Sequence, residues 1–273
     1  METSALRKVA KHLRLEAVRM VYEGKDGHPG PALSCADIVT TLYFDAMHID
    51  PKHPQDKNRD RFILSKGHAC PIYYAALNER GFLQPKVQDY KLRQLGSIFQ
   101  GHPSMRSGLP GIDMTSGSLG NGLAIGAGIA MAAKAHHKDY FTYVIVGDGE
   151  LQEGVIWEGA NIATGRALDN LIVFVDRNGW QSYKTVAWTV GVRQEAERFR
   201  AFGWHTQEIN GHDIDAIKAA ICLAKRTKGK PHAIICNTVK GKGLSFMEDN
   251  NAWHKGVPTD EEWEIAKKEL GGE

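Results

Sequence analysis

The sequence predicts an α/β protein, with a doubly wound, mostly parallel sheet flanked by helices. Short apolar runs typical of buried strands alternate with segments of helical periodicity along the whole chain, and this alternation is typical of parallel sheets. In addition, residues 143–181 read as a strand, a helix and a second strand, and such a crossover returns the second strand parallel to the first. We find no internal repeat or linker, so we expect a single domain over residues 1–273.

The expected elements follow from apolar spacing and from glycine and proline. Apolar residues from Leu6 to Val21 recur every three or four positions, which predicts an opening helix that ends at the Gly-Pro loop 27–31. The other expected helices cover about 35–47, from Pro71 onward, 119–134, 151–166, 191–201, 213–227 and 259–270. The expected strands cover 61–64, 141–146, 171–175, 205–209 and 232–238. Residues 94–117 show no period and are expected to form a long functional loop.

Composition excludes several classes of protein. A formal net charge of +2 with dispersed Lys and Arg gives no electrostatic case for nucleic-acid binding. The first twenty residues lack the apolar core of a secretory signal, and no apolar run is long enough to cross a bilayer. The cysteines are widely separated and form no CxxC pair, which favours reduced thiols and a cytoplasmic protein. They are Cys35, Cys70, Cys222 and Cys236.

Polar residues follow both strands of the 143–181 unit. The first strand ends at Gly147-Asp148-Gly149 and the second at Asn178. An Asp-Gly pair alone is usually only a turn. Here, however, the carboxyl ends of two parallel strands bring a carboxylate and an amide together, and ligands of parallel sheets bind at such ends. Mg²⁺ prefers these oxygen ligands together with phosphate, and the helix start at Glu150 favours an anion. The unit therefore predicts a magnesium diphosphate site, and no GxGxxG supports a nicotinamide cofactor instead.

Six blocks of sequence carry a family resemblance. In chain order they are GHPG at 27–30, RDRF to SKGH at 59–68, GHP at 101–103, GSLGNG at 117–122, GDGELQEG at 147–154 and GKGLSFMEDNNAWHKGVP at 241–258. With these blocks the chain resembles the N-terminal, diphosphate-binding half of transketolases, specifically the short subunit of split transketolases. Because the blocks keep their order over almost the whole chain, the resemblance is specific.

The resemblance implies a thiamine diphosphate site with bound Mg²⁺. The implied metal ligands are Asp148, Asn178 and the backbone carbonyl of Trp180. The residues implied to lie beside the cofactor are His68, Gly117, Ser118, Leu119, Gly149, Glu150, Asn178 and His254. The implied catalytic histidines are His28, His68, His102 and His254. Histidine suits such a channel because it both donates and accepts protons near neutral pH.

The resemblance also implies a companion chain. In the family, the glutamate that activates the cofactor lies in a pyrimidine-binding domain C-terminal to this one, as do most residues that clamp the sugar phosphate. This chain ends first, so we expect a second subunit with that domain, the cofactor at the interface, and an α₂β₂ heterotetramer. Glu153 is expected to support a partner's catalytic carboxylate, although a plain helix-face charge is the alternative. The small residues Gly122, Gly126 and Ala130 are expected to let their helix pack at a subunit interface, with plain helix packing as the alternative.

The implied activity is transfer of a two-carbon ketol unit from a ketose phosphate to an aldose phosphate. Two departures from the family pattern bear on the substrate. Asn121 stands where family members usually carry glutamine, and the segment after Trp180 continues into Ser182-Tyr183-Lys184-Thr185 where an Asp-Gly turn is usual. A second hypothesis is therefore a specialised pathway of sugar catabolism or natural-product assembly with a non-standard acceptor. Two further alternatives are the thiamine subunit of a 2-oxo acid dehydrogenase, whose members lack this histidine set, and a non-catalytic binding subunit, which need not keep the site residues together.

Overall fold

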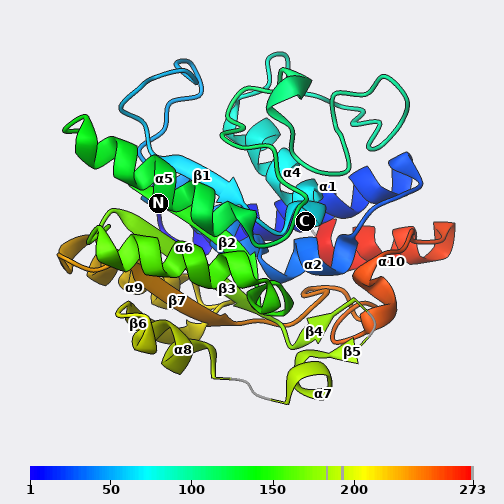
Figure 1. Ribbon diagram of the computed structural model, residues 1–273. Helices are drawn as coiled ribbons and strands as arrows, with labels where there is room; N and C mark the ends of the chain where they lie inside the picture. Colours follow the sequence, from blue (N-terminus) through cyan, green and yellow to red (C-terminus); the bar gives the residue numbers. More distant parts are fainter. Residues whose placement is uncertain (183, 192–193, 272–273) are drawn as a thin grey trace.

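A five-stranded parallel sheet forms the centre of the molecule (Figure 1). The computed structural model describes residues 1–182, 184–191 and 194–271. The strands, in spatial order, are β1 (Arg61–Leu64), β2 (Thr142–Gly147), β3 (Leu171–Arg177), β7 (His232–Asn237) and β6 (His205–Asn210). Every neighbouring pair is parallel, which confirms the predicted fold class. Each strand lies within two residues of its expected position.

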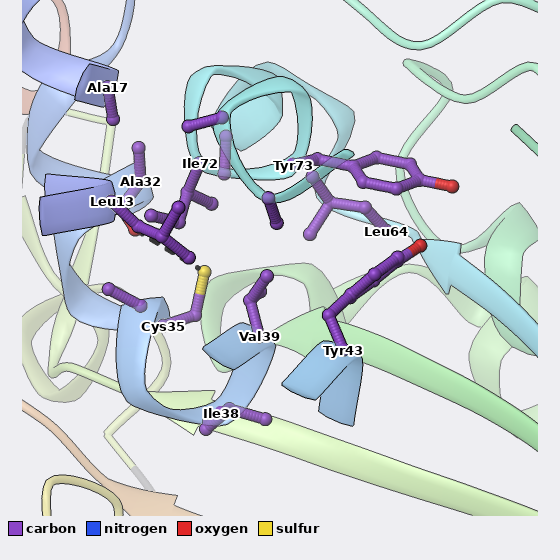
Figure 2. Close-up of a cluster of buried hydrophobic side chains, with 14 of the residues drawn as sticks. Leu13, Ala17, Ala32, Cys35, Ile38, Val39, Tyr43, Leu64, Ile72 and Tyr73 are labelled. Atoms are coloured by element: carbon purple, nitrogen blue, oxygen red, sulfur yellow. Dashed lines mark hydrogen bonds between the residues drawn. The ribbon is translucent and has the colours of Figure 1, made fainter. Parts of the chain in front are cut away.

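Helices cover both faces of the sheet, because the central strands bury side chains on both sides. In β2, Tyr143 and Ile145 belong to one apolar cluster, whereas Val144 and Val146 belong to the other. The first cluster, shown in part in Figure 2, lies under α1 (Thr3–Gly24), α2 (Pro29–Ser34), α3 (Ala36–Thr41), α4 (Cys70–Arg80), α9 (Ile214–Arg226) and α10 (Asp260–Gly271). The second lies under α5 (Asn121–Ala135), α6 (Gly154–Gly165) and α8 (Glu195–Ala201). None of the helices in the described ranges is both long and apolar enough to cross a membrane.

The helical region around the expected helix 35–47 begins before that range and is divided into three parts. Helical structure begins earlier, at Pro29, because proline is tolerated in the first helical turn. The chain then continues as α3 and as a π turn over Leu42–Ala46. Similarly, the expected helix 151–166 is preceded by a 3₁₀ turn, Gly149–Gln152, before α6 begins. Of the expected helix 191–201, α8 begins at Glu195, and residues 192–193 lie outside the described part of the chain.

The small residues of α5 face the sheet of their own chain. A Cβ atom at Gly122 would lie 2.3 Å from the Ser65 hydroxyl, and one at Gly126 would lie 2.7 Å from the Val144 side chain. Gly122 and Gly126 therefore let the helix approach β1 and β2 closely, as plain packing within the chain requires, and the expectation that α5 packs at a subunit interface stays a prediction. The other side of the helix exposes Ile125 and Met131.

Two short strands form an antiparallel hairpin beside the sheet. They are β4 (Trp180–Gln181) and β5 (Lys184–Thr185), and α7 (Val186–Val190) follows them. Tyr183 belongs to the segment after Trp180 that departs from the family pattern, and it lies outside the described residues. Neither the hairpin nor α7 was predicted, because elements of two to five residues carry no periodic signal.

Candidate functional site

A cavity of about 410 Å³ lies at the carboxyl ends of β1, β2, β3 and β7. Its lining includes every predicted site residue except Ser118, which is exposed and holds the turn before α5 through a 2.8 Å hydrogen bond from the Asn121 amide. The predicted residues in the lining are His28, His68, His102, Gly117, Leu119, Asp148, Gly149, Glu150, Asn178, Trp180 and His254. The structure thus brings together side chains from both ends of the chain.

Asp148 and Asn178 follow neighbouring strands and lie at one end of the cavity. The strand register pairs Gly147 with Asp176, which places the next residues side by side. The Asp148 carboxylate accepts hydrogen bonds from the backbone N–H groups of Gly149 at 3.0 Å and Gly179 at 2.7 Å. The Asn178 amide oxygen accepts one from the backbone of Trp180 at 3.0 Å. The three implied metal ligands therefore form one compact group.

The donor set of this group suits a hard cation. Among the residues that the structure describes, no group of three or more His, Cys, Asp or Glu side chains is arranged to hold a metal. A cation at Asp148 would meet one carboxylate, the Asn178 amide oxygen and a backbone carbonyl, with the other positions left to ligand oxygens. Zinc prefers nitrogen and sulfur ligands, whereas Mg²⁺ is commonly held by one or two carboxylates and phosphate. The residues present therefore fit a magnesium diphosphate.

The buried carboxylate of Glu150 joins three segments around the cavity. It accepts hydrogen bonds from the Ser65 hydroxyl, from the Gly120 N–H at 2.7 Å and from the Gly147 N–H at 3.0 Å. Burial raises the pKa of this carboxyl. Because its oxygens bind protein donors, the Glu150 side chain fixes the ends of β1 and β2 and the start of α5.

Four histidines line the cavity, and three of them form a triangle. The ring centroids of His28 and His68 are 5.2 Å apart, those of His68 and His254 are 5.3 Å apart, and those of His28 and His254 are 5.6 Å apart. His102 packs against Gly117, where a Cβ atom would lie 3.1 Å from the His102 ring and where φ is +132°. Glycine is therefore required at position 117 both by the conformation and by the contact.

Burial keeps these imidazoles neutral at pH 7. It lowers the pKa of His28 to about 4 and that of His254 to about 3, and it also lowers the pKa values of His68 and His102. The cation of Lys240 acts in the same direction on His254 and donates a hydrogen bond to its Nδ1 at 3.0 Å. A neutral His254 therefore carries its proton on Nε2.

The lowered pKa values predict a loss of stability in acid. In the unfolded chain a histidine gains a proton below pH 6.5, whereas folded His28 and His254 do so only near pH 4 and 3. The unfolded state thus binds more protons, so the free energy of unfolding should fall as the pH falls from about 6.5 to about 3. Urea denaturation of the ligand-free chain at several pH values measures this. Carboxylates contribute to acid sensitivity as well, so the double variant His28→Gln/His254→Gln is the control. Its stability should fall less steeply over the same range, and equal slopes would contradict the assignment.

Two lysines that line the cavity were not predicted as site residues from the sequence. Lys66 is only 2% exposed, and its Nζ lies 2.6 Å from the Asp176 carboxylate. Lys240 donates to His254 and, at 2.7 Å, to Asn251, while burial lowers its pKa to about 8. Lys66 follows β1 and Lys240 follows β7, so both lie near the carboxyl ends of the strands, where the site was predicted. Their position after a strand could therefore have indicated them.

A carboxylate outside the predicted set connects the loops that carry the histidines. Asp26 lies 2.8 Å from Arg93 Nε and 3.4 Å from Lys255 Nζ. Arg93 in turn lies against Gly101, where a Cβ atom would be 2.3 Å from its guanidinium. The loops that bear His28, His102 and His254 are thereby held to one another. No sequence pattern marks such contacts between loops.

The β4–β5 hairpin forms one wall of the cavity. The indole N–H of Trp180 donates to Asp249 at 2.7 Å, and Asn251 donates to the Ser182 carbonyl at 2.9 Å. A Cβ atom at Gly149 would lie 2.6 Å from Gln181. The segment that departs from the family pattern is therefore tied to the loop that carries His254.

Comparison with known proteins agrees with this geometry. The family model described as "Transketolase, thiamine diphosphate binding domain" matches residues 5–273. The chain is 42% identical over 270 residues to one subunit of the apulose-4-phosphate transketolase of Phocaeicola vulgatus, covering 99% of this chain and 95% of that protein. It is 44% identical over 244 residues to the 6-deoxy-6-sulfo-D-fructose transketolase subunit SqwG of Clostridium sp. (strain MSTE9), covering 89% and 88%.

Full-length transketolases are also similar, but this chain spans about two fifths of their length. Mouse transketolase is 38% identical over 253 residues, which are 92% of this chain and 39% of that protein. Among solved structures, the transketolase of Campylobacter jejuni superposes with a TM-score of 0.92 at 34% identity. That match covers 99% of this chain and 43% of the Campylobacter chain.

Proposed function

The chain belongs to the transketolase family, and from that premise we propose that it is the N-terminal subunit of a two-chain transketolase that holds thiamine diphosphate and Mg²⁺. The observation that carries the proposal is the single cavity in which Asp148, Asn178 and four histidines meet. A 2-oxo acid dehydrogenase subunit is not supported, because the family match, together with this histidine cluster, points to transketolase. The reaction is transfer of a two-carbon ketol unit from a ketose phosphate to an aldose phosphate.

In this proposal, each part of the cavity has its own task. Asp148, the Asn178 amide oxygen and the Trp180 carbonyl would hold the magnesium ion, while Lys240 and His68 would face the diphosphate. The chemistry that thiamine diphosphate supplies when bound is a nucleophilic carbon able to carry the two-carbon unit. The neutral imidazoles would bind substrate hydroxyls and move protons at their oxygens. His254 suits a donor role, since Lys240 occupies its Nδ1 and leaves the proton on Nε2.

The proposal includes a companion chain. Two similar proteins that this chain covers almost completely are named as subunits, which supports a second subunit. We place the pyrimidine-binding domain on that subunit, with the cofactor between the two chains and an α₂β₂ assembly. Glu153 lines the cavity and is available to a carboxylate of the companion.

Two relatives motivate a second candidate substrate class. The names of these proteins specify apulose 4-phosphate and 6-deoxy-6-sulfo-D-fructose, which are specialised sugars. The β4–β5 hairpin departs from the usual family turn and forms a wall of the cavity. A non-standard acceptor or donor within a sugar-degrading pathway is therefore the alternative to ordinary pentose phosphates.

Reconstitution of the two-chain enzyme tests the proposal. The chain is purified with its native companion, and ketol transfer is measured with several ketose donors, with and without thiamine diphosphate and Mg²⁺. We expect activity that needs both cofactors and both chains. Robust transfer by this chain alone would contradict the two-subunit assembly. Transfer from specialised sugars without any from pentose phosphates would select the alternative substrate class, and absence of cofactor binding would contradict the site itself.

A further inference from the structure

Beneath the cavity, one fully buried carboxylate gathers donors from four segments. Asp176, in β3, accepts hydrogen bonds from Lys66 Nζ at 2.6 Å and from the hydroxyls of Ser34 and Thr238. It also accepts one from the Asn178 side-chain amide at 3.1 Å. Asp176 therefore holds together, beneath the cavity, the segments that follow β1 and β7 and the end of α2.

In the hydrogen bond between Asn178 and Asp176, the amide of Asn178 is the donor and the carboxylate of Asp176 is the acceptor. An ionised carboxylate only accepts hydrogen bonds, whereas an asparagine amide has one donor end and one acceptor end. Asp176 therefore selects the donor end of Asn178, Nδ2, for the buried side. The acceptor end, Oδ1, is left on the side of Trp180, whose backbone N–H it binds at 3.0 Å. The amide oxygen is the only end of that side chain able to bind a cation.

We propose that Asp176 is a positioning residue that fixes the orientation of the Asn178 amide, so that Oδ1 rather than Nδ2 faces the magnesium position. This inference rests on the proposed function, because it concerns the cation of that site. Partners behind a metal ligand commonly matter, and their loss typically weakens metal affinity by about 10-fold to 100-fold. Asp176 thus affects the metal through another residue.

For Asn178→Asp, the proposal predicts weaker metal binding, whereas the charge of the new ligand alone would predict stronger binding. Asn178→Asp introduces a carboxylate, which by itself is a better magnesium ligand than an amide. With Asp176 unchanged, however, two carboxylates would face each other in the 3.1 Å contact, and the new side chain would be repelled from its place. Asp176→Asn replaces a side chain that can only accept by an amide that can present either an oxygen or an N–H, so it no longer imposes one orientation on the Asn178 amide. The double variant Asp176→Asn/Asn178→Asp restores one donor facing one acceptor and leaves an oxygen toward the metal.

Electron paramagnetic resonance of Mn²⁺ with thiamine diphosphate and the complex of the full chain with its companion tests this, and circular dichroism of the chain monitors folding. Each single variant should weaken Mn²⁺ affinity by about tenfold or more, and the double variant should return to within about threefold of the wild type. Asn58→Asp adds the same charge at an exposed loop position and should change nothing.

If Asn178→Asp binds Mn²⁺ as tightly as the wild type, or the double variant binds no better than the singles, the orienting role of Asp176 is overturned. If Asp176→Asn does not fold, the comparison of Asn178→Asp with the double variant decides the question in the same way. Failure of the wild-type two-chain complex to bind Mn²⁺ with thiamine diphosphate would instead overturn the proposed function.

Discussion

Replacement of Lys66 by methionine should lower the free energy of unfolding by about 3–5 kcal/mol, the usual cost of removing one partner of a buried ion pair. Asp176 is completely buried, and although burial opposes it, the Lys66 cation helps to keep the pKa of this carboxyl lowered. Lys66 also donates to the Pro31 carbonyl at 2.7 Å. Methionine fills similar space but leaves the carboxylate with only neutral donors. Urea denaturation at pH 7 measures the loss.

The chain offers a matched control for this substitution. Lys86 pairs with Glu79 at 2.8 Å, but the side chains are 48% and 33% exposed. Lys86→Met should therefore cost no more than about 1 kcal/mol. In the double variant Lys66→Met/Asp176→Asn the buried negative charge is gone, so part of the stability should return. A Lys66→Met variant as stable as Lys86→Met would show that the buried pair contributes little.

Replacement of Asp148 by alanine should abolish the part of thiamine diphosphate binding that depends on Mg²⁺. Asp148 supplies the only carboxylate among the three implied metal ligands, and it also accepts hydrogen bonds from the backbones of Gly149 and Gly179. Without it a divalent cation would have only neutral protein ligands. Isothermal titration with thiamine diphosphate, with and without Mg²⁺, gives the metal-dependent increase in affinity. We expect that increase to vanish in the variant.

Two comparisons separate this effect from damage to the fold. Asp89→Ala removes an exposed carboxylate paired with Lys91 at 3.6 Å and should leave the increase intact. The thermal midpoint of Asp148→Ala reports any loss from its two backbone hydrogen bonds, which is expected to be about 1–3 kcal/mol. A folded Asp148→Ala chain that keeps the full magnesium effect would disprove the metal role of this residue.

The sheet could be predicted because its central strands are continuous apolar runs between helical periods. The same reasoning located Asp148 and Asn178, since residues that directly follow parallel strands share one edge. The four histidines were predicted from the family resemblance, because the local sequence of a loop does not indicate where the loop lies in space.

The contacts between distant segments could not be predicted. Lys66 and Asp176 are 110 residues apart in sequence, and each looks like an ordinary charged residue until the fold buries them together. Asp26 binds two loops that have no local pattern, so its role depends wholly on tertiary structure. The surface that Gly122 and Gly126 contact could not be predicted for a related reason: small residues permit a close contact, but they do not say which surface provides it.

The position of the cavity residues along the chain has a consequence for folding. His28 lies near the start and His254 near the end, yet their rings are 5.6 Å apart. Contacts of such large sequence separation form late, because closing a long loop costs entropy before the contact is gained. A partly folded chain, or one still emerging from the ribosome, therefore has no cofactor site. A ligand of this cavity therefore binds only the folded state, and it stabilises that state against unfolding by mass action.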